Sequence, residues 1–253
     1  MHDSTRTAAA LVIGNELLTG KIRDRNVAVL GRLLFELGIT LQRAVICLDD
    51  EAGIAADLDS LRAEHDIVFT SGGVGPTHDD VTIRAVARCL GRPVVRSRRL
   101  EALVRGYFGG SVSEAHLRMA DVPEGTELVV GSTSPWPVVR VENVFVLPGL
   151  PEIFALKIPI LREHLVAGPG FISRSVHAAS DELEIADLLA DLDARFPQVA
   201  IGSYPRVGDD RVRVMVTFDG RDLARVEAAA QAFREALPPD RLVEVEPASE
   251  TQA

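Results

Sequence analysis

Apolar positions along the first two thirds of the chain form two kinds of pattern. Residues 8–13 and 67–69 are apolar without interruption, as in parallel strands that are buried on both faces. Between them, apolar residues from Val27 to Leu37 recur every three or four positions, which is typical of an amphipathic helix. This alternation of strand and helix predicts an α/β domain with three layers, α/β/α, around a mostly parallel sheet.

The pattern changes after residues 167–170, Ala-Gly-Pro-Gly, which are the best candidate for a linker. Beyond them, strand and helix patterns follow one another in the order β-α-β-β-α-β, which is typical of a small ferredoxin-like α+β unit. We therefore expect a first domain at residues 8–167, a second unit at residues 171–246 and a disordered tail at residues 247–253.

Composition narrows the class of protein. The 253 residues include 27 basic and 37 acidic side chains, a net charge of −10 that argues against nucleic acid as a partner. The apolar run at residues 8–13 is too short for a signal sequence or a membrane span, so we expect a cytoplasmic protein with no membrane partner. Cys47 and Cys89 lack the spacing of a zinc site and are expected to be reduced, buried thiols.

The loop at residues 70–82 carries the most specific chemical signal, because it joins the apolar run 67–69 to a helical pattern. Its three glycines let backbone N–H groups approach an anion, and the helix N-terminus favours negative charge. Asp79 and Asp80 follow, and since carboxylates repel phosphate, a divalent cation between them is expected. In the simpler alternative the loop is a tight turn in which one of the two aspartates caps the helix.

Two further loops also lead from a predicted strand into a helix. Gly14–Glu16 follow the first strand, and Pro148–Glu152 follow a strand at residues 144–147. Because the carboxyl ends of parallel strands meet at one edge of a sheet, we expect all three loops to share one pocket. A rigid turn that opens a helix with Pro151 is an equal alternative for the third loop.

Glu16 could complete a carboxylate cluster with Asp79 and Asp80, or belong to a helix cap. We predict these three as catalytic and metal-binding residues, for metal-assisted attack of water on a phosphoanhydride. The predicted ligand-binding residues, which lie in the three loops and at the start of the first long helix, are Gly14, Asn15, Asn26, Ser71, Gly72, Gly73, Gly75, Pro76, Thr77, Thr82, Pro148, Gly149, Pro151 and Glu152.

Three other features have a functional and a plainer interpretation. His78 could be a metal ligand or an exposed loop residue. The basic run from Arg96 to Arg99 could contact an anion or form a solvated face. Trp136 could stack on a purine or flavin ring or pack in the core. The sequence contains no GxSxG motif, P-loop or GxGxxG motif, so serine hydrolase and P-loop kinase functions have no support.

The three loop motifs, at residues 13–20 with Asn26, at residues 71–82 and at residues 147–152, resemble the MoaB/MogA-like molybdopterin-binding domain. They are most similar to its branch in the competence/damage-inducible protein CinA and in the N-terminal half of some eukaryotic FAD synthases. Residues 201–205 resemble the stretch that follows this domain in FAD synthases. In CinA-type chains an Asn and a Gln usually stand where this sequence has His116 and Met119, and Met119 is closer to the FAD synthase branch.

The resemblance implies a three-layer α/β/α fold and three possible functions. One is divalent-metal-dependent (Mg, Mn or Co) hydrolysis of ADP-ribose, FAD or a similar dinucleotide. Another is binding of molybdopterin or a pterin phosphate without hydrolysis, and a third is a non-catalytic CinA-like relic. It also implies that Glu16 and one of Asp79 and Asp80 lie in the ligand site, and that the chain forms a homo-oligomer, a dimer or trimer.

Overall fold

The computed structural model describes residues 6–243, apart from residues 133, 167, 207 and 209–210. The chain divides into two compact units, Met1–Gly168 and Pro169–Ala253. The boundary falls within the linker predicted at residues 167–170. The tail predicted at residues 247–253 lies outside the described residues.

A six-stranded sheet forms the centre of the first unit, in the order β2-β1-β3-β8-β7-β6. Its strands are β1 (Thr7–Ile13), β2 (Thr40–Cys47), β3 (Ile67–Ser71), β6 (Glu127–Val129), β7 (Val138–Val141) and β8 (Val144–Leu147). The first four in the order, β2, β1, β3 and β8, run parallel. The next strand, β7, is antiparallel to β8, and β6 is antiparallel to β7, so only β7 runs against the others. The mostly parallel sheet predicted from the sequence is confirmed.

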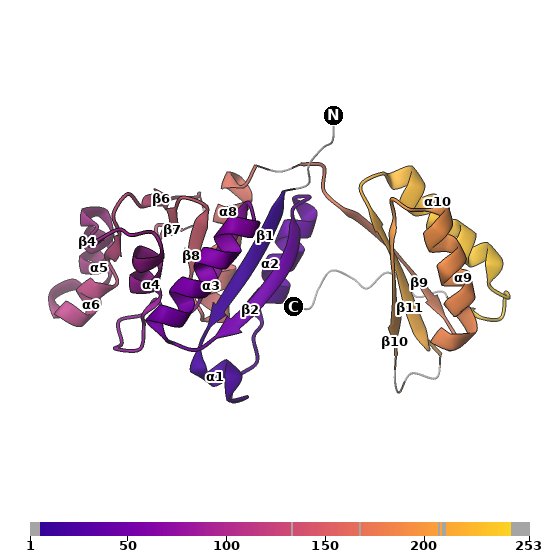
Figure 1. The fold of residues 1–253 in the computed structure, drawn as a ribbon, viewed down its shortest axis with the longest axis horizontal. Helices are drawn as coiled ribbons and strands as arrows, with labels where there is room; N and C mark the ends of the chain where they lie inside the picture. Colours follow the sequence, from indigo (N-terminus) through magenta and orange to yellow (C-terminus); the bar gives the residue numbers. More distant parts are fainter. Residues whose placement is uncertain (1–5, 133, 167, 207, 209–210, 244–253) are drawn as a thin grey trace. The chain divides into compact units, whose positions relative to one another are not determined.

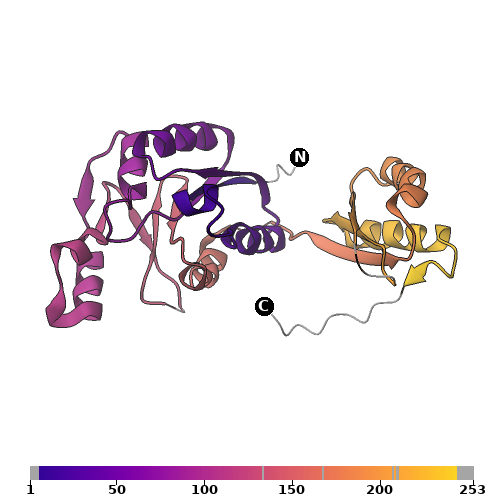
Figure 2. The ribbon, with the colours of Figure 1, turned by 90° about the horizontal axis from the view of Figure 1, so that it is seen from below.

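Helices cover both faces of this sheet (Figures 1 and 2). Successive residues of β1 point to opposite faces, so Ala8 and Ala10 enter one apolar core while Ala9 and Leu11 enter the other. The first core is completed by α2 (Asn26–Glu36), α7 (Pro151–Ala155) and α8 (Ile158–His164), and the second by α3 (Glu51–Glu64) and α4 (Thr82–Cys89). The three-layer arrangement is therefore confirmed.

A smaller subdomain separates α4 from β6. It consists of β4 (Val94–Arg96) paired with β5 (Asp121–Pro123), together with α5 (Arg98–Phe108), η1 (Gly109–Ser111) and α6 (Glu114–Arg118). A separate apolar cluster built around Leu100, Val104 and Leu117 holds it together, and Trp136 packs against this cluster. The short strand β5 and the short helix α1 (Asn15–Leu18) were not predicted from the sequence.

One predicted helix is wrong. The stripe from Ile153 to Leu161 indicates a single helix, but the structure breaks it into α7 and α8. Pro159 lies in the first turn of α8, where its missing N–H costs no hydrogen bond. In a continuous helix its ring would clash with the preceding turn. Lys157 therefore stands between the two helices rather than within one.

The second unit contains β9 (Ile172–Ala178), α9 (Glu182–Arg195), β10 (Ala200–Pro205), β11 (Val214–Gly220), α10 (Leu223–Ala236) and β12 (Leu242–Val243). Its antiparallel sheet has the order β10-β11-β9-β12, the ferredoxin-like order expected from the sequence. Val214, Val216 and Phe218 alternate into the core beneath α9 and α10.

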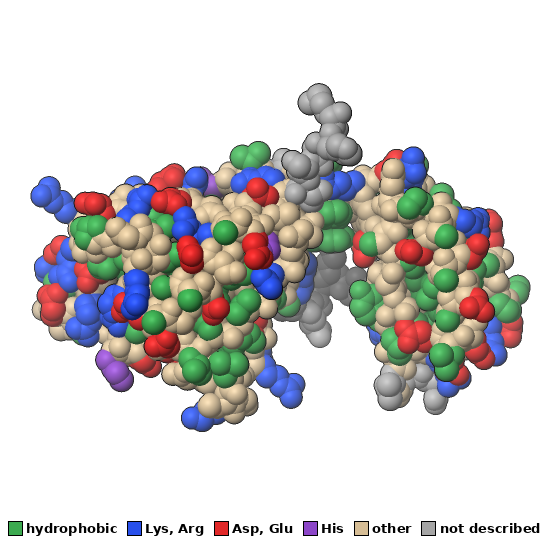
Figure 3. Space-filling model, in the orientation of Figure 1, with side chains coloured by type: hydrophobic (Ala, Val, Ile, Leu, Met, Phe, Trp, Pro, Cys, Tyr) green, Lys and Arg blue, Asp and Glu red, His purple; other side chains and the backbone are tan. Residues whose placement is uncertain are grey.

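On the face drawn in Figure 3, acidic and basic side chains are interspersed, with no continuous basic surface. None of the described helices combines the length and the apolar character that crossing a bilayer requires. Cys47 and Cys89 are free and half-buried, and burial with nearby aspartates raises the pKa of Cys47 to about 12, as suits an unreactive thiol.

Candidate functional site

The three predicted loops lie side by side, because β1, β3 and β8 are adjacent parallel strands. Their backbones touch through glycines. A Cβ added to Gly72 would lie 2.2 Å from the carbonyl oxygen of Ile13, and one added to Gly149 would lie 3.0 Å from the Cα of Gly72. Gly72 also has a φ of 106°, which L side chains rarely adopt. Glycine is therefore required where the loops meet.

Asn26 ties two of the loops together from the start of α2. Its Nδ2 donates to the Oγ of Ser71 at 2.9 Å and to the carbonyl oxygen of Gly149 at 2.8 Å. Asn26 is only 3% exposed and does not cap its helix; Asp24 accepts the N–H of Val27 instead. Asn26 therefore begins α2 without capping it, and its described contacts make it a positioning residue.

The glycine-rich loop is closed by its own side chains. The backbone N–H of Thr77 donates to Asp80 at 2.8 Å, and the Thr77 hydroxyl lies within hydrogen-bond distance of both Asp79 and Asp80. This hydroxyl lowers the pKa of Asp79. A Cβ at Gly75 would lie 2.7 Å from Asp80, so glycine makes room for that carboxylate.

The α4 helix begins without a side-chain cap, at Thr82. Asp79 and Asp80 are thus not the helix caps of the alternative interpretation. The Thr82 hydroxyl instead reaches back to the carbonyl oxygen of Gly72 at 2.8 Å and fixes the loop to the helix.

The predicted three-carboxylate cluster is not formed. In the part of the chain that the structure describes, no three Asp, Glu, His or Cys side chains gather closely enough to hold a metal ion. The Glu16 carboxylate lies back over the Gly14 backbone, and Asp49 accepts the N–H of Asn15 and fixes the loop in that position. Asp79 and Asp80 alone still fit a cation that is shared with phosphate oxygens, since Mg²⁺ often uses one or two carboxylates plus substrate.

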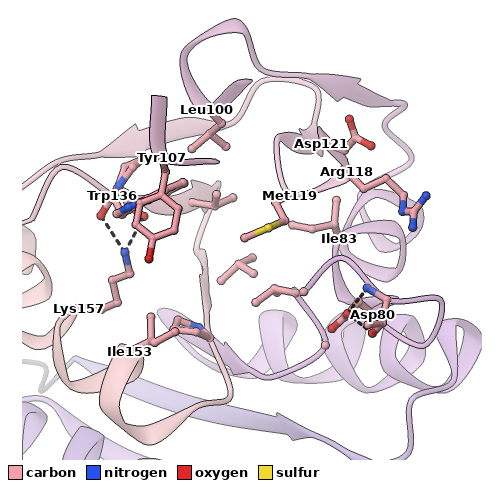
Figure 4. Close-up of a pocket in the computed structure, with 18 of the residues that line it drawn as sticks. Asp80, Ile83, Leu100, Tyr107, Arg118, Met119, Asp121, Trp136, Ile153 and Lys157 are labelled. Atoms are coloured by element: carbon pink, nitrogen blue, oxygen red, sulfur yellow. Dashed lines mark hydrogen bonds between the residues drawn. The ribbon is translucent and has the colours of Figure 1, made fainter. Parts of the chain in front are cut away.

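A pocket of about 700 Å³ opens beside the glycine-rich loop (Figure 4). Among the predicted site residues, Gly73, Gly75, Thr77, Asp80 and Pro148 line it. The other predicted site residues do not line it; they are Gly14, Asn15, Glu16, Asn26, Ser71, Gly72, Pro76, Asp79, Thr82, Gly149, Pro151 and Glu152.

The far wall of the pocket comes from elements that the sequence did not connect with the site. Tyr107 from α5 and Trp136 before β7 meet edge to face, with ring centroids 5.8 Å apart. Arg118 from α6 lines the mouth and donates to the carbonyl oxygen of Pro76 at 2.9 Å, which joins the subdomain to the glycine-rich loop. Lys157, between α7 and α8, lies opposite Asp80 (Figure 4). Of these four residues, only Trp136 was a candidate from the sequence.

Two other predicted contacts are resolved. Arg96 pairs with Glu114 at 2.7 Å and with Asp121 at 2.8 Å, so its charge is already matched within the subdomain. The side chain of His78 is 99% exposed, with Nδ1 3.9 Å from Asp79. Its position matches the plainer interpretation, an exposed loop residue.

Comparison with known proteins agrees with this architecture. Residues 9–163 match the family model described as a probable molybdopterin binding domain. The chain belongs to the molybdopterin-binding domain family. Residues 170–246 match a second model, the middle domain of FAD synthase. The ferredoxin-like unit is therefore similar to the middle domain of FAD synthase.

Relatives of this molybdopterin-binding domain protein include probable FAD synthases and CinA-like proteins. A probable FAD synthase of Caenorhabditis elegans is 31% identical over 260 residues, 92% of this chain and 50% of that protein. A CinA-like protein of Myxococcus xanthus is 32% identical over 238 residues, 87% of this chain and 56% of that protein. The chain thus spans about half the length of these relatives.

A solved structure shares the fold of the first unit. The crystal structure of the protein CinA from Thermoplasma acidophilum superimposes with a TM-score of 0.58 at 26% identity, over 63% of this chain and 97% of that one. The shared portion corresponds in extent to the molybdopterin-binding domain.

Proposed function

We propose that this chain is a divalent-metal-dependent nucleotide pyrophosphatase that hydrolyses ADP-ribose, FAD or a similar dinucleotide. The observation that carries the proposal is the two-sided pocket, with Asp80 and the backbone of residues 73–75 on one side and Tyr107 and Trp136 on the other. A dinucleotide has the same division into charged pyrophosphate and planar ring. A volume of about 700 Å³ lies within the usual range of small-molecule sites.

In this proposal the loop residues have separate roles. Gly73 and Gly75 offer backbone N–H groups to phosphate oxygens, because glycine allows the backbone to approach them closely. Asp79 and Asp80 would hold the cation and would orient a water molecule toward phosphorus. That water forms a new P–O bond while the bridging P–O bond breaks, which gives two phosphate monoesters. When bound, the cation would neutralise charge on the phosphate oxygens.

Two other functions use the same pocket. The description of the family model that matches residues 9–163 favours binding of molybdopterin or another pterin phosphate without hydrolysis. A non-catalytic CinA-like role is the third possibility. We also propose that the chain forms a homo-oligomer, a dimer or trimer, by the family resemblance.

Incubation of the purified chain with ADP-ribose and with FAD, each with Mg²⁺, Mn²⁺ or Co²⁺, tests the proposal. We expect AMP from at least one substrate, and a loss of about a hundredfold or more in rate for Asp80→Asn. Asp79→Asn should reduce the rate as well. Asp187→Asn, the same charge change at an exposed position in the second unit, is the matched control.

Absence of AMP under every condition would reject the pyrophosphatase. So would rates for Asp79→Asn and Asp80→Asn equal to that of the unmodified chain. Tight binding of a pterin phosphate without turnover would favour the second function.

A further inference from the structure

Lys157 lines the pocket on the side opposite the glycine-rich loop (Figure 4). The residue is only 7% exposed. Its Nζ donates to the carbonyl oxygens of Trp136 at 2.8 Å and of Pro137 at 3.3 Å. An ammonium group carries three protons, so these two acceptors leave one donor for a ligand in the pocket.

Lys157 differs from Arg84 and Arg96, two arginines near the pocket, because those arginines form ion pairs with carboxylates. Asp121 pairs with Arg96 at 2.8 Å, and Arg84 pairs with Glu51 at 3.2 Å. Within the described parts of the chain, no carboxylate forms an ion pair with Lys157, and burial lowers its pKa to about 8. A buried ammonium without a counter-ion is unfavourable, and an acceptor on a ligand would offset that cost.

The residue type supports the same interpretation. The sequence has only two lysines, Lys21 and Lys157, and arginine supplies its other basic side chains. Arginine stays charged in proteins, whereas a buried lysine can lose its proton. A lysine here can lose its proton and so avoid the free-energy cost of a buried charge. It can still be protonated and donate a hydrogen bond when a ligand offers an acceptor.

The surroundings of Lys157 are aromatic and apolar. Its hydrogen bond fixes the backbone of Trp136, and the Tyr107 ring meets the Trp136 ring at 77°. Leu100 and Ile153 line the cavity on either side, and the Met119 thioether points into it (Figure 4). Aromatic and thioether groups of this kind form favourable surfaces for a flat ring.

We propose that Lys157, Trp136 and Tyr107 form a ring-binding subsite for a fused heterocycle with a carbonyl edge, such as a flavin or a pterin, whose oxygen accepts a hydrogen bond from Nζ. The assignment depends on the proposed function only in placing the phosphate of the same ligand at the glycine-rich loop.

The chemistry of the subsite selects among rings. An ammonium group only donates, so it favours an edge made of carbonyl oxygens and deprotonated ring nitrogens. The Watson–Crick edge of adenine presents an amino donor beside its acceptor and matches Lys157 less well. Leu100 and Ile153 make this end of the pocket apolar, so it suits a flat ring better than a phosphate group.

Separate probes for the ring and the phosphate test the proposal by isothermal titration calorimetry. Riboflavin supplies the ring without phosphate, and ribose 5-phosphate supplies phosphate without a ring. We expect Lys157→Met to weaken riboflavin binding about tenfold to a hundredfold, the usual effect of losing a hydrogen bond to a charged group, and to leave ribose 5-phosphate binding within about twofold. Lys21→Met, which removes the other lysine, should change neither.

A second variant keeps the test decisive if Lys157→Met unfolds, which near-UV circular dichroism will reveal. Tyr107 is 72% exposed, so Tyr107→Ala removes part of the wall without opening the core. It should weaken riboflavin and spare ribose 5-phosphate. Riboflavin binding that neither folded variant weakens overturns the subsite, as does a loss confined to ribose 5-phosphate.

The subsite and the proposed function fail separately. Riboflavin binding that requires Lys157, in a protein that releases no AMP, would leave the subsite standing and reject the pyrophosphatase. Release of AMP from ADP-ribose by a protein that does not bind riboflavin would support the pyrophosphatase and reject the subsite.

Discussion

Asn26 shows how a single buried amide can hold a site in place. Its Nδ2 supplies both hydrogen bonds that tie α2 to Ser71 and Gly149, while its Oδ1 is buried without a described partner. A carboxylate at this position would have no proton to donate and would face the Gly149 carbonyl oxygen. The role of Asn26 therefore depends on which atom donates, not on its size.

We expect Asn26→Asp to lower the free energy of unfolding by about 3–5 kcal/mol near pH 7, because it buries an unpaired charge. Asn26→Ala should cost less, about 1–3 kcal/mol, since it removes only the donor. The difference should shrink at about pH 4, where a protonated Asp can donate. Urea unfolding measures all three proteins, and an Asp variant as stable as the Ala variant near pH 7 would contradict the argument.

Lys157 makes stability depend on pH in a defined direction. Its pKa falls from 10.5 to about 8 on folding, because burial disfavours the charged form. Between these values the unfolded chain binds the proton and the folded chain does not, so the contribution of Lys157 to stability rises with pH.

The free energy of unfolding of the unmodified chain, relative to Lys157→Met, should therefore increase by about 3 kcal/mol between pH 8 and pH 10.5. Below pH 8 the difference should be nearly constant. Thermal unfolding at a series of pH values provides the measurement, with Lys21→Met as the control for an exposed lysine. A constant difference above pH 8 would show that Lys157 titrates like an exposed lysine, and a falling difference would show that folding raises its pKa.

At the scale of the elements, the junction of β1, β3 and β8 depends on Gly72. Its positive φ and the 2.2 Å approach of an added Cβ to the Ile13 oxygen leave no room for a side chain. Gly91 also has a positive φ, but a Cβ there would meet nothing within 4 Å. An alanine at Gly91 would cost free energy only through its backbone conformation, whereas an alanine at Gly72 would also clash with β1.

We expect Gly91→Ala to cost about 1 kcal/mol of unfolding free energy, the usual penalty of a left-handed conformation. Gly72→Ala should cost several times more, or prevent folding, because the loop must also move away from β1. Thermal unfolding of both variants provides the comparison. Equal losses would mean that the strand ends can separate without cost.

The elements that the sequence predicted well are those whose apolar pattern is continuous. The runs at residues 8–13 and 67–69 lie in β1 and β3, and the strand predicted at residues 144–147 is β8. The prediction failed where local pattern and chain geometry disagree. The apolar stripe of α7 and α8 ignores Pro159, and β5 is too short to show a period of its own.

At the scale of the whole molecule, two units with separate cores follow one another along the chain. In the first unit β2 is an edge strand, and apolar side chains are exposed on it and on the nearby α1 region: Leu18, Ile22, Ile46 and Leu48 are 45–57% exposed. Exposed apolar groups beside a sheet edge are typical of an interface. They support the proposed homo-oligomer.

Sedimentation of the purified chain should therefore reveal a dimer or trimer. Leu48→Glu should shift it toward monomer, because it places a charge in the apolar patch. Leu183→Glu, at a position that is 91% exposed on α9, is the matched control and should leave association unchanged. A monomer at every concentration would contradict the proposal, as would association that Leu48→Glu does not weaken.

The sequence by itself indicated that the three strand-to-helix loops meet at one edge of the sheet. Backbone torsion, strand direction and glycine spacing are local properties, and adjacent parallel strands bring Gly14, Gly72 and Gly149 together in any sheet of this order. Only the tertiary structure decided which carboxylates stay together and what faces them. Glu16 turns back on its own loop, and Lys157 meets Trp136 because α7 ends before Pro159. Contacts between residues so far apart depend on packing, which no local pattern records.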